Sequence, residues 1–198
     1  MTNRPMAIEL QRVNVKLYLE DEAGIAPEEA FRVFNRWISE TAEEVLIDVA
    51  DYTHIEQGPQ TLLIGHEADY VLDNTDGRLG LKYGRKRPVE GDAQQRLRDA
   101  ILRTLSACRR LEEATETQGR AQFRGGEMQI SVLDRLHAPN RSETLNGLRD
   151  DLLAVLSQVY GEADITLSRN EDDRQCLTVQ IQATGHFTVA DMLASLAA

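Results

Sequence analysis

Cysteine and long apolar runs are the two features that this sequence most clearly lacks. Its 198 residues include two cysteines and no Cys-x-x-Cys motif, which argues against a thiolate zinc site and a dithiol redox centre. No segment approaches the roughly 18 apolar residues of a membrane span, and the first residues lack the apolar stretch of an export signal. Because Cys108 and Cys176 fall in apolar periodic segments, we expect two reduced, core-forming cysteines and a cytoplasmic protein.

Positive charge is also scarce. The chain has 22 Lys and Arg against 33 Asp and Glu, which gives a formal net charge of −11. Such a charge repels polyanions, so nucleic acid and anionic membranes are poor partners. The one dense basic cluster is either a solvated strand end that pairs with acidic neighbours or a contact for RNA, a phosphorylated ligand or a protein partner. The candidate ligand or partner contacts are Tyr70, Lys82, Arg85, Lys86 and Arg87.

Hydrophobic residues make up 41% of the chain, and they follow two periods. Residues 13–20 alternate as in a half-buried strand, whereas the apolar residues after Pro27 recur at helical spacing. Strands are expected over residues 13–20, 44–55, 61–73, 77–86, 127–135, 163–168 and 176–183. Helices are expected over residues 27–40, 92–111 and 142–160 and after Thr188. Three of them have capping pairs, namely Asp92 with Gln95, Asn140 with Glu143, and Thr188 with Asp191.

The order of these segments repeats along the chain. It is β-α-β-β-(β)-α before the polar stretch TETQGRAQ and β-α-β-β-α after it. This repetition predicts an α+β fold of two tandem units, ferredoxin-like in character, with a mainly antiparallel sheet and helices on one face. The units would span residues 1–118 and 119–198, either as two domains or as one continuous pseudo-symmetric domain. A single irregular α+β domain is the alternative.

The stretch LLIGHEADYVLD, residues 62–73, has His, Glu and Asp within four positions, as metal sites and acid/base pairs do. If the stretch is one strand, His66 points to one face and Glu67 and Asp69 to the other, so the three cannot share a metal ion. The zinc-protease motif HExxH is also absent, because residue 70 is Tyr. We therefore expect no metal site here.

The neighbouring strand suggests a partner for His66. If EQGPQ makes a compact hairpin with Ile55 opposite Leu62, the same register places Asp51 opposite His66. Asp51 and His66 are therefore the candidate catalytic or ligand-binding pair. The alternative is a structural hydrogen bond in or beside the core.

Several segments carry a resemblance to other proteins. The runs LIDVADYTHIEQGPQTLLIGHEADYVLD, GRLGLKYGRKRP and DRLHAPN resemble an uncharacterised family of bacterial proteins, and the likeness extends over most of the chain. The resemblance implies a bacterial origin. It implies no activity and transfers no catalytic or binding residue.

Two classes of function fit these observations. Glycine-rich phosphate loops, Ser-His-Asp order and paired histidine ligands are missing, so we expect no cofactor and favour a non-catalytic interaction, scaffold or regulatory protein. We expect a homodimer or a protein partner, because sheets of such units leave edges that proteins cover or use. The alternative is a small-ligand-binding protein or enzyme with a cleft between the two units that uses Asp51 and His66.

Overall fold

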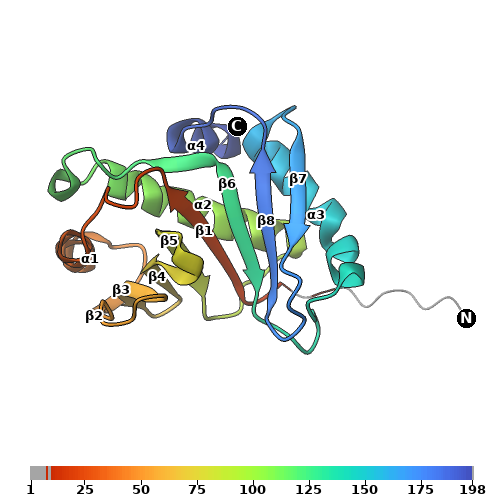
Figure 1. The fold of residues 1–198 in the computed structure, drawn as a ribbon, viewed down its shortest axis with the longest axis horizontal. Helices are drawn as coiled ribbons and strands as arrows, with labels where there is room; N and C mark the ends of the chain where they lie inside the picture. The colour runs from red at the N-terminus through yellow and green to blue at the C-terminus, as the bar shows by residue number, and fades with distance from the viewer. Residues whose placement is uncertain (1–7, 9, 198) are drawn as a thin grey trace, which may run out of the picture.

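In the computed structural model, which describes residue 8 and residues 10–197, the described chain forms one antiparallel sheet of eight strands in the order β2-β3-β4-β5-β1-β6-β8-β7 (Figure 1). The strands are β1 (Val13–Leu19), β2 (Leu46–Asp51), β3 (Pro59–Gly65), β4 (Ala68–Asp73), β5 (Gly80–Arg85), β6 (Phe123–Val132), β7 (Ile165–Arg169) and β8 (Leu177–Ala183). The α-helices are α1 (Pro27–Glu40), α2 (Ala93–Glu112), α3 (Ser142–Tyr160) and α4 (Val189–Ala197), and two short 3-10 helices are η1 (Thr75–Gly77) and η2 (Thr115–Thr117).

All four α-helices of the described chain cover the same face of the sheet. Helix α1 packs on β2 and β3, α2 on β1 and β5, α3 on β7 and β8, and α4 on β6. One row of paired residues crosses six strands on this face, and every member is buried. The row is Leu63, Tyr70, Tyr83, Val15, Ile130 and Val179. Burial of these apolar side chains against the helices holds the two layers together.

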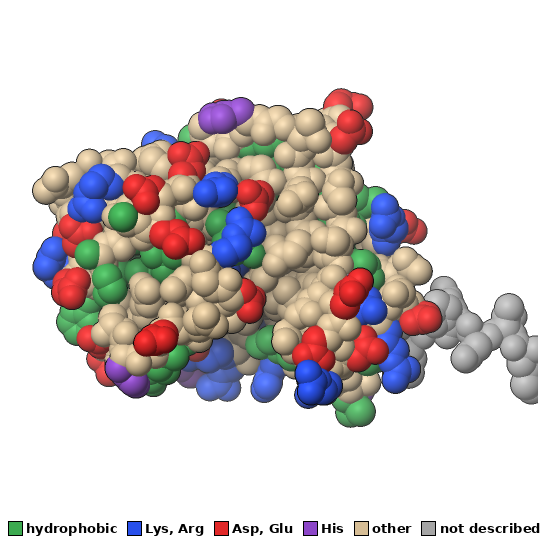
Figure 2. Space-filling view, in the orientation of Figure 1, with side chains coloured by type: hydrophobic (Ala, Val, Ile, Leu, Met, Phe, Trp, Pro, Cys, Tyr) green, Lys and Arg blue, Asp and Glu red, His purple; other side chains and the backbone are tan. Residues whose placement is uncertain are grey.

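The opposite face of the sheet carries no helix among the described residues, and it is largely polar. The row next to the apolar one is Leu62, Val71, Lys82, Lys16, Gln129, Gln180 and Ser168. Figure 1 shows α2 and α3 behind the sheet, and Figure 2 shows the open face from the front. Over β6 and β8 this face is formed mainly by uncharged side chains and backbone, with charged groups toward the margins.

Two of the three predicted capping pairs are confirmed. The Asp92 carboxylate accepts a hydrogen bond from the Gln95 amide at 2.8 Å, and the Asp191 carboxylate accepts one from Thr188 at the start of α4. The Asn140 cap is wrong, because Arg141 occupies the N-cap of α3. The Asn140 side chain instead donates to backbone carbonyls in the loop between β7 and β8.

The prediction of an α+β fold with an antiparallel sheet is confirmed, but one predicted strand is wrong. Residues 61–73 do not form a single strand. They form β3 and β4, which pair with each other across a two-residue turn made of His66 and Glu67. Strands β1 and β6 are direct neighbours, and buried side chains from before and after residue 118 join one core cluster.

Candidate functional site

Asp51 and His66 do not face each other. Asp51 pairs with Thr61 across β2 and β3, and its carboxylate accepts a hydrogen bond from the Thr53 amide at 2.8 Å. That contact lowers the pKa of Asp51. The predicted register is wrong because β2 ends at Asp51 and β3 begins at Pro59. The loop between the two strands therefore covers residues 52–58, whereas the prediction assumed a hairpin over EQGPQ, residues 56–60.

His66 lies in the exposed turn between β3 and β4. Its side chain is 52% exposed, and its ring lies 3.9 Å from the Glu67 carboxylate. The backbone fixes the turn, since the His66 amide donates to the Val45 carbonyl and the Lys86 amide donates to the Glu67 carbonyl. The imidazole is therefore not needed to hold the turn.

We expect His66→Ala to change the free energy of unfolding by less than about 0.5 kcal/mol, as for surface substitutions without buried partners. Urea denaturation of the variant beside the unmodified protein measures this change. A loss above about 1 kcal/mol would contradict the exposed-turn description.

The other candidate contacts are dispersed over the surface rather than gathered in one site. Lys82 pairs with Asp73, Lys86 with Asp69 at 2.7 Å, and Arg85 with Asp99 at 2.9 Å. The Arg87 side chain makes none of the ion pairs found among residues 8 and 10–197. The predicted basic cluster is thus largely neutralised by acidic neighbours, which was the simpler of its two interpretations.

Tyr70 is buried on the helix-covered face of the sheet. Its hydroxyl donates to the Glu44 carboxylate at 2.7 Å, and burial together with Glu44 raises the pKa of Tyr70. The hydroxyl borders a cavity of about 300 Å³ between α1 and α2. Tyr70 therefore has no contact with the basic side chains of the open face.

The centre of the open face holds a buried ion cluster that sequence reasoning missed. Lys16 is 2% exposed and its ammonium lies 2.8 Å from the Asp73 carboxylate, which is 1% exposed. Lys82 pairs with the other oxygen of the same carboxylate. Because β5, which carries Lys82, lies between β1 and β4, Lys16 makes this contact across an intervening strand.

The two buried charges depend on each other. Burial lowers the pKa of Lys16, and the Asp73 carboxylate offsets that effect only in part. Burial alone would raise the pKa of Asp73, but the two ammonium groups outweigh it and the pKa lies below its usual range. A buried charge of this kind is costly unless it is paired. The contacts of Lys16 with Asp73 and with the Thr75 carbonyl therefore hold the end of β4 and η1 near β1, across β5.

A second polar group crosses the same face next to Lys16. The Tyr18 hydroxyl donates to the Gln180 side-chain oxygen at 3.0 Å. The Arg78 guanidinium lies 3.8 Å from the centre of the Tyr18 ring and reaches Glu127 at 2.5 Å. Tyr18 thus links β1 to β8 across β6, and side-chain contacts between strands that are distant in sequence connect the centre of the face.

The two edges of the sheet differ in their hydrogen-bonding state. In β2 the Tyr52 amide bonds the Gln60 carbonyl, so by the antiparallel alternation the Val49 and Asp51 backbone groups point outward. The Asp48 carboxylate accepts the Val49 amide at 2.8 Å. The Asp48 carboxylate therefore occupies one outward amide of β2, and the carboxylates at residues 48 and 51 charge this edge, which hinders the addition of another strand.

The β7 edge has no such protection among the described residues. The Asn170 amide bonds the Thr178 carbonyl, so the backbone groups of Ile165 and Leu167 point outward. No hydrogen bond found in the described part of the chain uses these two outward amides. The strand sequence ITLSR contains no proline, glycine or acidic residue, so β7 presents an open edge.

Exposed apolar side chains gather near the other edge. Of the seven large hydrophobic residues exposed in the described chain, five lie on α1, on β2 or beside β2. They are Phe31, Val45, Ile47, Tyr52 and Ile55, and we call this set the β2 apolar surface. Val45 is 64% exposed and Ile47 is 56% exposed. Figure 2 shows hydrophobic side chains at the left margin, over α1 and β2.

The described residues contain no group of three or more His, Cys, Asp or Glu side chains that could hold a metal ion. None of the helices found in residues 10–197 has the length and apolar character needed to cross a membrane. A scan against models of known protein families finds no match to the chain, and a search of curated proteins finds none either. Any functional argument therefore starts from the two edges and the open face.

Proposed function

We propose that the protein is a non-catalytic interaction protein that forms a homodimer through its β7 edge. The observation that supports this most directly is the contrast between the two edges. At β2, the Asp48 carboxylate occupies the outward Val49 amide and Asp51 adds a second negative charge, whereas no hydrogen bond found in the described residues uses the outward amides of Ile165 and Leu167 on β7. An open edge strand of this kind is a template for pairing with another chain.

A second copy fits this edge by two-fold symmetry. Antiparallel pairing about Leu167 would set Thr166 of one protomer opposite Ser168 of the other, and Ile165 opposite Arg169. Such an interface is isologous and closes after two copies. It would extend the sheet from one protomer into the next and keep the helices of both on the same face.

The dimer would present its β2 apolar surface twice, at the two far ends of the extended sheet. Exposed apolar patches of this kind mark surfaces that bind other proteins. A dimer with two such ends is a scaffold that can hold two copies of a partner protein. The carboxylates at residues 48 and 51 favour docking through side chains over strand addition at these ends.

A non-catalytic role is supported by the positions of the candidate residues. Asp51 and His66 lie apart in exposed loops and strand ends, and each contacts only its own neighbourhood. Cys108 is fully buried, and burial raises the pKa of its thiol, which opposes a nucleophilic role. Within the described residues, the Lys16, Asp73 and Lys82 cluster is satisfied internally rather than directed at a substrate.

We also propose that the chain is built from two tandem ferredoxin-like units and that it works in the bacterial cytoplasm. After β1 and again after β6, the chain forms a helix and then strands whose last member returns to pair with the first, β5 with β1 and β8 with β6. Superposing residues 13–116 on 128–197 tests the repeat, which fails if α1 and α3 take different positions. Both cysteines are free thiols, which suits a reducing compartment, and cell fractionation tests the location.

The dimer proposal is tested by placing like charges opposite each other at β7. Thr166 and Ser168 are exposed in the protomer, so Thr166→Lys with Ser168→Lys leaves the core intact but opposes lysines across the proposed interface. We expect the unmodified protein to be a dimer and this double variant a monomer, measured by gel filtration with light scattering at micromolar concentration.

The matched control carries two lysines at the other edge, Val45→Lys with Ile47→Lys, and should remain a dimer. A monomeric unmodified protein would overturn the proposal. So would a control that becomes monomeric while the β7 variant stays dimeric, since that result would place the interface at β2.

A further inference from the structure

A cavity of about 620 Å³ lies on the open face of the sheet, over the region where β5, β1, β6 and β8 run side by side. Its lining is dominated by side-chain amides and hydroxyls, which are Asn14, Thr75, Gln129, Ser131, Asn170, Gln175, Thr178 and Gln180. Most of its lining lies on β1, β5, β6 and β8 and on the loops beside them. Of the described lining residues, Arg169 at the end of β7 also belongs to the proposed dimer interface.

The floor of the cavity is a grid of neutral hydrogen-bonding groups. Gln129 and Gln180 lie opposite each other on β6 and β8, and Asn14, Ser131 and Thr178 form the next row across β1, β6 and β8. Neighbouring strands set the groups of a row about 4.8 Å apart. The floor thus offers regularly spaced donors and acceptors rather than a single anchoring group.

Three amides of this floor retain hydrogen-bonding capacity. No hydrogen bond found in the described chain uses the side chains of Asn14 or Gln129, and Gln180 uses its oxygen for Tyr18 but keeps its two N–H donors. Gly84 lies opposite Asn14, where an added Cβ would meet the Asn14 side-chain oxygen at 2.9 Å. The absence of a side chain at this position keeps room around the Asn14 amide.

The charges in the cavity cancel. Of its cations, Lys82 is paired with Asp73 and Arg169 with Asp173 at 3.2 Å. The exposed Asp76 carboxylate adds a negative charge at the rim. The described lining therefore has no uncommitted cation for a phosphate or carboxylate, and Asp76 repels anions.

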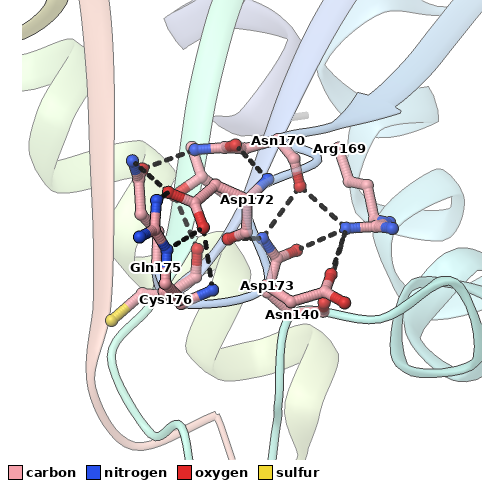
Figure 3. A network of polar contacts seen from close by, with 9 residues as sticks. Asn140, Arg169, Asn170, Asp172, Asp173, Gln175 and Cys176 are labelled. Atoms are coloured by element: carbon pink, nitrogen blue, oxygen red, sulfur yellow. Dashed lines mark hydrogen bonds and ion pairs between the residues drawn. The ribbon is translucent and has the colours of Figure 1, made fainter.

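One wall of the cavity is held in place by a polar network (Figure 3). Asn140, which precedes α3, donates to the Asn170 and Asp172 carbonyls at 2.8 and 3.0 Å. Arg169 donates to the Asn170 carbonyl at 2.8 Å, and the Asn170 side chain contacts Gln175 at 2.5 Å. These contacts fix the loop between β7 and β8, so the wall is formed before any ligand binds.

We infer that this cavity binds a neutral polyhydroxylated ligand, a sugar or a polyol. Each hydroxyl group of such a ligand donates one hydrogen bond and accepts others, which matches side-chain amides that do both. An anion would lack a free cation, and the described lining residues other than Leu133 and Cys176 are all polar or charged. A site built to bond hydroxyls leaves its amides unpaired when a ligand lacks them.

The inference is tested by titrating the isotope-labelled protein with neutral sugars and following its side-chain amide signals by NMR. The probes are glucose, galactose, N-acetylglucosamine and maltose at millimolar concentration, with inorganic phosphate and glucose 6-phosphate as charged counterparts. We expect at least one neutral sugar to shift the amide signals of Asn14, Gln129 and Gln180, and inorganic phosphate to leave them unchanged.

Asn14→Leu with Gln129→Leu should weaken that sugar's affinity about tenfold or more, because two hydrogen-bonding groups are lost. Gln182→Leu is the matched control, since Gln182 is an exposed amide on β8 outside this cavity, and it should bind as the unmodified protein does. The inference is overturned if no neutral sugar shifts these amides, if only the charged probes do, or if the control is weakened equally. The titration follows Asn14, Gln129 and Gln180, which lie outside β7, and light scattering follows the dimer, so the failure of one proposal is distinguishable from the failure of the other.

Discussion

Asp73→Asn is expected to lower the free energy of unfolding by about 3–5 kcal/mol, the cost of removing one partner from a buried ion pair. The Lys16 ammonium is 2% exposed, so it would stay in the sheet without a compensating charge. An asparagine has nearly the shape of the aspartate, so packing changes little. Urea denaturation at neutral pH measures the loss.

The matched variant Lys16→Met should lose less, no more than about 2 kcal/mol, because Asp73 keeps Lys82 as its counter-charge and the methionine fills the space. Equal losses in the two variants would contradict this account. They would indicate that packing, rather than the uncompensated ammonium, sets the cost.

The pH dependence separates the two buried groups. The pKa of Asp73 lies below its ordinary value of 3.8 in the folded protein, so its stabilisation is present above that value and is lost as pH falls below it. The pKa of Lys16 lies below its ordinary value of 10.5, so the unfolded state binds more protons and stability rises as pH increases toward 10.5.

In Asp73→Asn the carboxylate that raises the pKa of Lys16 is gone, so this alkaline gain should be larger than in the unmodified protein. The difference between the two proteins should therefore shrink as pH rises. A constant difference between neutral and alkaline pH would exclude an uncompensated Lys16 ammonium as the cause.

Gly80→Ala is the second substitution with a large expected effect, a loss of about 3 kcal/mol in the free energy of unfolding through overpacking. Gly80 pairs with Tyr18 of β1 and with Asp73 of β4. An added Cβ would lie 2.2 Å from the Leu17 carbonyl oxygen. Because the obstructing atom belongs to the backbone, β1 and β5 must separate to admit the methyl group.

Gly147→Ala is the matched control for this prediction. Gly147 lies in α3 and is exposed, with the nearest side-chain atom 4.0 Å from an added Cβ. Alanine there should stabilise the protein by up to about 1 kcal/mol, because it has a higher helix propensity than glycine. Thermal melts of both variants should move in opposite directions, and a Gly80→Ala variant as stable as the unmodified protein would contradict the close approach of β1 and β5.

Helices and strands with a regular spacing of apolar residues could be predicted from the sequence. The turn that interrupts one predicted strand was missed. Residues 27–40 and 142–160 are helical as their apolar spacing indicates. The prediction of a single strand over residues 61–73 was wrong because a two-residue turn reverses the chain there. The reversal changes which residues share a face, so Leu63 and Tyr70 lie together on the buried side. Gly65 was the residue in the sequence that could have indicated this turn. The structure explains the glycine, since an added Cβ at residue 65 would lie 2.4 Å from the Ala68 carbonyl oxygen.

The polar centre of the open face could not be predicted from the local sequence. Lys16 had the alternation of a solvent-facing strand residue, and Asp73 is 57 positions away in the chain. Their contact depends on the order of strands in the sheet, which alternation does not specify. The unequal edges depend on it too, because the role of Asp48 follows only once β2 is known to be an outer strand.

The position of β1 has a consequence for how the chain folds during synthesis. Among the described strands β1 is made first, yet its two neighbours come much later, since Asn14 pairs with Gly84 and Val13 with Val132. Sheets closed by such distant pairings fold slowly, because the intervening chain must be ordered before the contacts form. Until β6 leaves the ribosome, β1 lacks one of its two neighbouring strands. We therefore expect β1 to be the strand that a chaperone can bind for the longest time during synthesis.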